Sequence, residues 1–205
     1  MSLVIHDEIE QGTYQWLQLR AGVPTASMFH AILAKGEGKT RRSYLCRLAA
    51  EIITGEPSET FVNQAMERGK RMEEEARDLY AFTTNSELRR VGFVRNGPKG
   101  CSPDSLIGND GALEIKTQRG DLLIETILKN QFPSEHKAQC QGCLWVAERE
   151  WVDISIYWPN MPQFIKRAYR DDLYIRDLAA EVERFNAELC EMVERLRRFG
   201  QRAAA

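Results

Sequence analysis

The stretch CSPDSLIGNDGALEIKTQ, residues 101–118, decides the fold class of this 205-residue chain. Its apolar residues alternate on both sides of the turn-forming segment 108–111, a pattern that predicts two short strands joined by a tight turn. Glu114 and Lys116 are two residues apart on the second strand, so their side chains leave the same face. Asp104 begins the first strand, and we expect it to converge on that face across the hairpin. The hairpin therefore predicts a cluster of two carboxylates and one amine.

Such a cluster has a specific chemistry. Carboxylate oxygens are the ligands that hard divalent cations prefer, and Mg²⁺ commonly keeps several waters beside one or two of them. An ammonium next to the cation can orient or deprotonate a water, or neutralise charge on a phosphate. The spacing alone also occurs in hairpins whose charged residues only face solvent, so it leaves both interpretations open.

The hairpin residues resemble the PD-(D/E)xK nuclease motif, and the resemblance extends beyond them. Four blocks in a fixed order, over about residues 14–158, are similar to the lambda-exonuclease-like (YqaJ) viral recombinase family. Besides the hairpin, the blocks are Trp16–Arg20 with Thr25–Ser27, Glu67–Arg77, and Ala138–Trp145.

The resemblance implies roles for individual residues. Asp104, Glu114 and the carbonyl of Ile115 would hold the metal, and Lys116 would assist the attacking water. Glu73 would add a third carboxylate from a helix, as a two-metal site requires, whereas Glu74 and Glu75 are interpreted as a solvated face.

A helix segment contributes an amide to the expected site. Gln139 and Gln141 are two residues apart and do not share a helix face, and each alone would be expected at the surface. The resemblance favours Gln139 as the active-site residue. His136 lies one turn earlier, and its role stays open.

A pocket for a terminal phosphate is also implied. Arginine is a forked, permanently charged donor that fits phosphate oxygens, and hydroxyls add further donors. Thr25 is expected to cap a helix whose first turn contains Ser27. The candidates for the pocket are Arg20, Ser27, Ser102 and Arg119. Arg119 follows the hairpin earlier than the arginine of the family does, which leaves the fourth pocket residue in doubt.

Composition limits the remaining options. Net charge is −2, which argues against a protein that coats nucleic acid by bulk electrostatics but allows a local basic lining. The basic segment 35–42 is expected to be a loop, either contacting DNA backbone or simply solvated. The Cys140-x-x-Cys143 pair lacks further metal-ligand motifs, which favours buried thiols over zinc.

The order of elements predicts an α/β fold with a mixed central β-sheet flanked by helices, the PD-(D/E)xK nuclease core. We expect helices at 13–20, 25–34, 41–54, 61–83, 134–147 and 171–199, strands between 88 and 117, and a hairpin of 152–158 with 163–169. The last helix is expected to pack on the fold, with an oligomer contact left open. The chain is expected to be a single nuclease domain over 1–205, with a disordered tail from about residue 200.

The expected function is a Mg²⁺-dependent 5′→3′ double-strand DNA exonuclease, with Mn²⁺ as a substitute. It would produce 3′ overhangs for phage-type recombination by strand annealing. The resemblance implies a homotrimer, double-stranded DNA ends and a single-strand annealing protein as partners. With no apolar run near the ~20 residues that cross a bilayer, we expect no membrane partner and a cytoplasmic location in a bacterial host, with a phage or prophage origin. The alternatives are an endonuclease or repair nuclease on the same core, or a non-catalytic DNA-binding protein.

Overall fold

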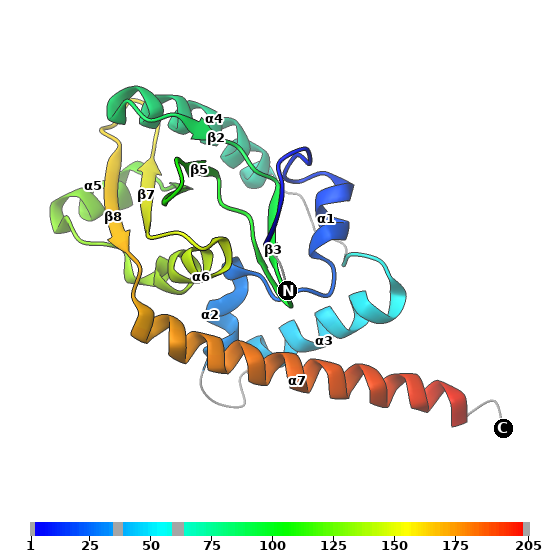
Figure 1. Cartoon of the computed structure of the whole chain (residues 1–205). Helices are drawn as coiled ribbons and strands as arrows, with labels where there is room; N and C mark the ends of the chain where they lie inside the picture. The colour runs from blue at the N-terminus through cyan, green and yellow to red at the C-terminus, as the bar shows by residue number, and fades with distance from the viewer. Residues whose placement is uncertain (1–2, 35–38, 59–63, 203–205) are drawn as a thin grey trace.

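The computed structural model describes residues 3–34, 39–58 and 64–202 and combines helices with two β-sheets (Figure 1). The larger sheet has five strands in the order β2-β5-β6-β7-β8. These strands are β2 (Leu88–Arg89), β5 (Ser105–Ile107), β6 (Gly111–Thr117), β7 (Trp151–Tyr157) and β8 (Phe164–Tyr169). Strands β6 and β7 are parallel, and the other neighbours are antiparallel. The mixed sheet, the β5–β6 hairpin and the β7–β8 hairpin are confirmed.

A second, three-stranded antiparallel sheet lies beside the first and was not predicted as a separate unit. It consists of β1 (Leu3–His6), β3 (Phe93–Asn96) and β4 (Lys99–Cys101), with β3 in the middle. Thr25 forms a parallel bridge with Gly100, and the Gly100 amide donates to the Pro24 carbonyl at 3.0 Å. This attachment holds the segment after the first helix against the strand that leads to Ser102.

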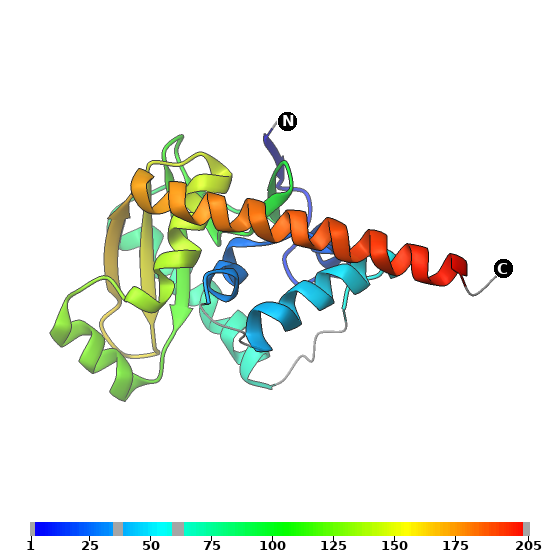
Figure 2. The same cartoon turned by 90° about the horizontal axis from the view of Figure 1, so that it is seen from below.

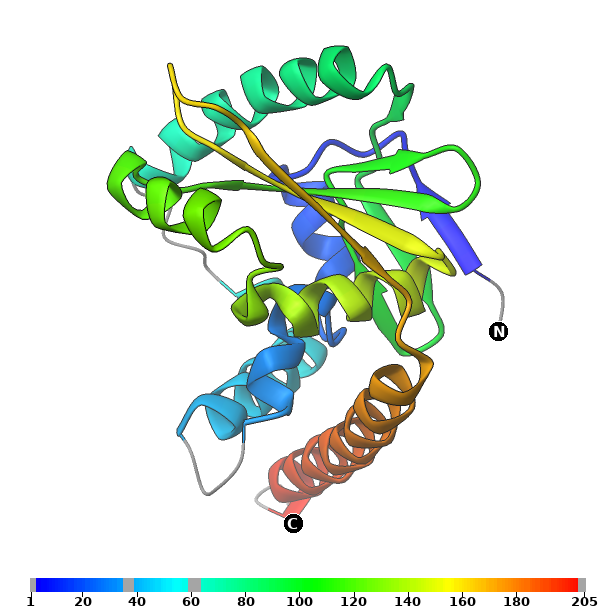
Figure 3. The same cartoon turned by 90° about the vertical axis from the view of Figure 1, so that its left-hand side faces the viewer.

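Helices cover both faces of the larger sheet (Figure 3). Helix α4 (Gln64–Thr84) packs on the face of β6 that carries Leu113 and Ile115. Helix α6 (Lys137–Ala147), preceded by the 3₁₀ turn η2 (Ser134–His136), covers the opposite face. Because side chains alternate along a strand, Glu114 and Lys116 point to the α6 face.

The helices beyond α6 form an outer layer (Figures 1 and 2). This layer contains η1 (Ala26–Met28), α2 (Phe29–Ile32), α3 (Lys39–Thr54) and α7 (Asp172–Arg202). Helix α1 (Tyr14–Arg20) lies instead beside β3. Helix α7 packs against α2, α3 and α6, and its buried stripe is Ile175, Leu178, Val182, Phe185, Leu189 and Val193. The packing of this helix on the fold is therefore confirmed, although Leu173 and Leu196 at its ends are exposed.

Several predicted boundaries were wrong. The segment 25–34 divides into η1 and α2, and Thr25 makes no side-chain cap. Helix α3 already begins at Lys39, where a loop was expected, and Arg41 pairs with Glu188 on α7 at 2.7 Å. The connecting segment after β6 contains a helix, α5 (Gly120–Lys129). Helix α7 continues to Arg202 instead of ending before residue 200. The rest of the predicted loop and tail (35–38, 203–205) and the start of the predicted helix (61–63) lie outside the described residues.

Candidate active site

The β5–β6 hairpin brings Asp104 and Glu114 together as its sequence predicts. The Asp104 amide donates to the Leu113 carbonyl at 3.0 Å, and the Ile115 amide donates to Asp104 Oδ2 at 2.5 Å. Glu114 is 5% exposed, and its Oε1 contacts Gln139 Nε2 at 2.5 Å and Lys116 Nζ at 2.8 Å. Two carboxylates, one amide and one ammonium thus converge between β6 and α6.

The charges of this cluster are not balanced. Burial, then repulsion by Glu114 and Glu73, raises the pKa of Asp104 well above its ordinary value. Burial lowers the pKa of Lys116, but attraction by Glu114 and Asp104 outweighs it and the net pKa is raised. The ammonium therefore stays charged, and Asp104 lies in an excess of negative potential that a cation would relieve.

The donor set fits a hard divalent cation. Asp104 and Glu114 offer oxygen ligands, and two carboxylates with retained waters are a common Mg²⁺ arrangement. In the described part of the chain, no three His, Cys, Asp or Glu side chains are grouped closely enough to hold an ion by themselves. Burial raises the pKa of the neighbouring Cys140 thiol.

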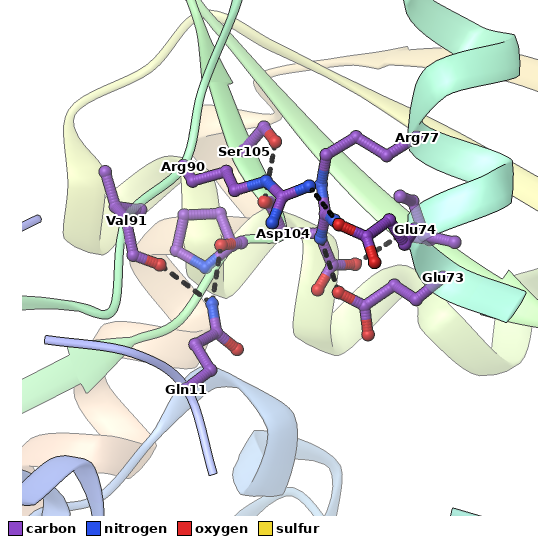
Figure 4. A network of polar contacts seen from close by, with 10 residues as sticks. Gln11, Glu73, Glu74, Arg77, Arg90, Val91, Asp104 and Ser105 are labelled. Atoms are coloured by element: carbon purple, nitrogen blue, oxygen red, sulfur yellow. Dashed lines mark hydrogen bonds and ion pairs between the residues drawn. The ribbon is translucent and has the colours of Figure 1, made fainter. Parts of the chain in front are cut away.

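Glu73 reaches this cluster only electrostatically. It projects from α4, and its Oε1 contacts Arg77 Nη2 at 2.5 Å (Figure 4). Its charge helps to raise the pKa of Asp104, yet Glu73 is not among the residues that line the cavity described below. As predicted, Glu74 and Glu75 are exposed; Glu74 pairs with Arg90 at 3.0 Å.

A cavity of about 180 Å³ joins the carboxylates to the predicted phosphate pocket. Its lining residues come from the N-terminal segment, α1, η1, the β4–β5 region, β6 and α6. They are Gln11, Trp16, Arg20, Ala26, Ser27, Cys101, Ser102, Asp104, Glu114, Gln139 and Cys143. Gly142 lets α6 pack closely against α2, since a Cβ there would lie 2.4 Å from the Phe29 ring.

Arg20 is at the centre of the predicted phosphate pocket. Its Nη1 donates to Ser102 Oγ at 3.1 Å and its Nη2 to Thr25 Oγ1 at 3.4 Å. Thr25 Oγ1 in turn lies 3.3 Å from Ser27 Oγ. Burial lowers the pKa of Arg20, and within the described residues the guanidinium forms no ion pair. A desolvated arginine beside hydroxyls and without a counter-ion is a site for an anion.

Two further residues organise the cavity and had no predicted role. Trp16 Nε1 donates to Ser102 Oγ at 3.0 Å and to the Gly92 carbonyl at 2.9 Å, and the Arg20 guanidinium lies 4.1 Å from its ring centroid. The four-residue spacing of Trp16 and Arg20 on one helix was the available signal. Gln11 Nε2 donates to the carbonyls of Val91 and Pro103 (Figure 4); no sequence pattern marked it.

The remaining candidates lie outside the cavity. Arg119 is exposed and donates through two nitrogens to Asp121, at 2.6 and 2.5 Å. Burial, then the Lys116 charge, lowers the pKa of His136, which precedes α6.

The second amide of the helix segment was assigned wrongly to the surface when considered alone. Gln141 is 3% exposed, donating to the Tyr169 carbonyl and accepting from the Asp171 amide. The buried thiols are confirmed: Cys140 and Cys143 are in the core, and Cys143 Sγ lies 3.8 Å from Cys101 Sγ.

Comparisons with known proteins identify the family of this chain. A model of the YqaJ-like viral recombinase domain matches residues 15–150. The chain belongs to the YqaJ-like viral recombinase family. No curated protein matched it.

Solved structures of relatives agree with this family. An alkaline exonuclease (LHK-Exo) from Laribacter hongkongensis is 31% identical, with a TM-score of 0.84 over 93% of this chain and 100% of that one. Its complex with dAMP gives a TM-score of 0.86 at the same identity and coverage. A phage-related exonuclease from Haemophilus somnus shares the fold, with a TM-score of 0.65 at 15% identity over 88% and 99% of the two chains. Membership in the YqaJ-like family supports a phage-type DNA exonuclease and implies a divalent cation. No helix in the described part of the chain is long and apolar enough to cross a membrane.

Proposed function

We propose that this protein is a Mg²⁺-dependent exonuclease that digests double-stranded DNA from the 5′ end and leaves a 3′ overhang. The supporting observation is that one cavity contains both the unpaired Arg20 and the carboxylates Asp104 and Glu114. Arg20, Ser27 and Ser102 would hold the terminal 5′-phosphate while the next phosphodiester bond lies at the carboxylates. Cleavage would then release a 5′-mononucleotide, the class of molecule to which dAMP in the Laribacter complex belongs.

The roles of the residues follow from their contacts. Asp104 and Glu114, with the Ile115 carbonyl, would hold the cation, which supplies positive charge to stabilise the phosphate in the transition state. Lys116, held by Glu114 at 2.8 Å, would orient the attacking water and add charge beside the phosphate. Gln139 fixes the Glu114 carboxylate at 2.5 Å and would position the water or the scissile phosphate. Glu73 would act through the potential that it imposes on Asp104.

The biological setting is part of the same proposal. A homotrimer acting with a single-strand annealing protein would supply 3′ overhangs to phage-type recombination in the cytoplasm of a bacterial host. Mn²⁺ would replace Mg²⁺ because both accept oxygen ligands. Family membership supports these statements.

The sharpest test of direction compares linear duplexes that carry a 5′-phosphate or a 5′-hydroxyl. The wild type should digest the phosphorylated end faster by at least ten-fold, because a charge-assisted contact of about 1.5–3 kcal/mol exists only when the phosphate is present. Arg20→Ala should remove the preference by slowing the phosphorylated substrate. Equal rates on both ends in the wild type, or cutting of closed circles, would favour an endonuclease instead.

A further inference from the structure

A second cavity, of about 140 Å³, lies next to the active-site cavity, and Trp16 and Arg20 line both. The carboxylates Asp104 and Glu114 line only the first. The second cavity is lined by α1, α3 and the turns after each of them. Besides Trp16 and Arg20, the polar residues Thr25, Tyr44, Arg47 and Glu51 line it. It therefore continues from Arg20 away from the expected site of cleavage.

Arg47 supplies this cavity with a second guanidinium. It is exposed on α3, and its Cζ lies 4.9 Å from the centroid of the Tyr44 ring. The Tyr44 hydroxyl accepts the Thr25 amide at 3.0 Å, and Thr25 accepts from Arg20. A short chain of contacts thus links the two guanidinium groups, and neither forms an ion pair within the described residues.

The single carboxylate in the second cavity is already engaged. Glu51 accepts the Gly22 amide at 2.8 Å through Oε2 and the Ser58 amide at 3.2 Å through Oε1. Its single negative charge does not balance the two positive charges of Arg20 and Arg47. Burial is the main cause that lowers the pKa of Arg20; the Arg47 charge also lowers this pKa, whereas Tyr44, Cys101 and Glu51 raise it. An anion between the two guanidinium groups would relieve this repulsion.

We propose that the second cavity binds a phosphate joined directly to the terminal phosphate, as in a 5′-diphosphate or 5′-triphosphate DNA end. The inference rests on the proposed function, in which Arg20 holds the terminal phosphate, and it extends the accepted substrates to polyphosphorylated ends. A volume of 140 Å³ corresponds to about four or five waters, which is room for a phosphate group. Arg20 would contact the phosphate attached directly to the 5′ carbon, from the first cavity. Arg47 would contact the next phosphate along the polyphosphate, in the second cavity.

Anion binding without metal tests the cavity directly. Calorimetric titration of the wild type should give pyrophosphate an affinity about ten-fold or more above that of orthophosphate, because only pyrophosphate reaches both arginines. Arg47→Gln should weaken pyrophosphate binding about ten-fold and abolish this difference. Arg42→Gln, a matched change of an exposed arginine on the same helix, should leave both affinities as in the wild type. Equal affinities for the two anions in the wild type, or an unaltered difference in Arg47→Gln, would overturn the proposal.

Digestion assays distinguish two sources of the second phosphate: a polyphosphorylated 5′ end and the DNA backbone. Linear duplexes would carry a 5′-triphosphate, a 5′-monophosphate, a 5′-hydroxyl, or a phosphorylated 5′ end with one unpaired nucleotide. Arg47→Gln should lower the ratio of triphosphate to monophosphate rates about ten-fold, and Arg42→Gln should not. If Arg47→Gln slowed only the unpaired-nucleotide substrate, a backbone phosphate would occupy the cavity and the proposal would be wrong. Wild-type indifference between monophosphate and hydroxyl ends would instead refute the proposed function, while the metal-free titration would still report on the second cavity.

Discussion

Arg20 illustrates how this site is prepared at the level of single residues. Its guanidinium loses solvation without gaining a carboxylate partner in the described part of the chain, an arrangement that costs stability unless an anion is bound. Trp16 limits the freedom of that guanidinium by lying beneath it while donating to Ser102 Oγ. The pocket is therefore held in shape before DNA arrives, which reduces the entropy lost on binding.

Trp16→Phe should separate these two contributions. Phenylalanine keeps an aromatic face under Arg20 but cannot donate to Ser102 and Gly92. We expect the rate preference for 5′-phosphorylated over 5′-hydroxyl ends to fall about 3- to 10-fold, the scale of one or two neutral hydrogen bonds. The matched control is Trp145→Phe. The Trp145 ring packs against Phe29, and this variant should keep the preference. If both variants lost it equally, Trp16 would have only a general packing role.

Lys116→Ala addresses the proposed catalytic role of the lysine that contacts Glu114. Turnover should fall by about 10²-fold or more, since one positioned charged or proton-transferring group has that effect. DNA affinity should change far less, because Lys116 Nζ contacts the Glu114 carboxylate, where we propose that cleavage takes place. Single-turnover rates and equilibrium binding, measured separately, check this; equal losses in both would make Lys116 a binding residue.

At the scale of elements, the strands and helices with strong periodicity were predicted well. The hairpin 101–118 was predicted because alternation and a glycine-bounded turn are local signals. Strand β1 was missed because its four residues become a strand by pairing with β3, about ninety residues away. Only the family resemblance pointed to Gln139, which contacts Glu114. Gln141 is buried because Tyr169 on β8 and Asp171, just before α7, supply its partners. No local pattern contains such long-range contacts.

The approach of α6 to α2 can be tested through a glycine. Gly142→Ala would bring a methyl group within 2.4 Å of Phe29, and overpacking of this kind destabilises by about 1–3 kcal/mol. Gly69→Ala on α4 is the control, since its added carbon would meet nothing closer than Thr117 Oγ1 at 4.0 Å. That change should be neutral or stabilise by up to about 1 kcal/mol. Denaturant unfolding measures both; a stability unaffected by Gly142→Ala would contradict the close packing described here.

On the scale of the whole molecule, the fold places helices on both faces of a mixed sheet (Figures 1 and 3). Residues of β6, α6 and the N-terminal elements together line the candidate active-site cavity. Because the two carboxylates are proposed to hold the catalytic cation, DNA affinity and DNA cleavage should depend differently on which metal is supplied. Ca²⁺ is larger and coordinates more flexibly than Mg²⁺. We expect Ca²⁺ to support binding of linear duplex without efficient digestion, and Mg²⁺ to support both. Efficient digestion with Ca²⁺ would argue against the cation role assigned to the carboxylates.

The most direct test of the central claim follows a linear duplex labelled separately at the 5′ and 3′ ends of one strand. With Mg²⁺, the wild type should release the 5′ label first as a mononucleotide and leave the opposite strand as a 3′ overhang. Asp104→Asn and Glu114→Gln, which remove a charge with little change in volume, should bind the duplex but release no label. Release of the 3′ label first, or Mg²⁺-dependent digestion by either variant, would contradict the account.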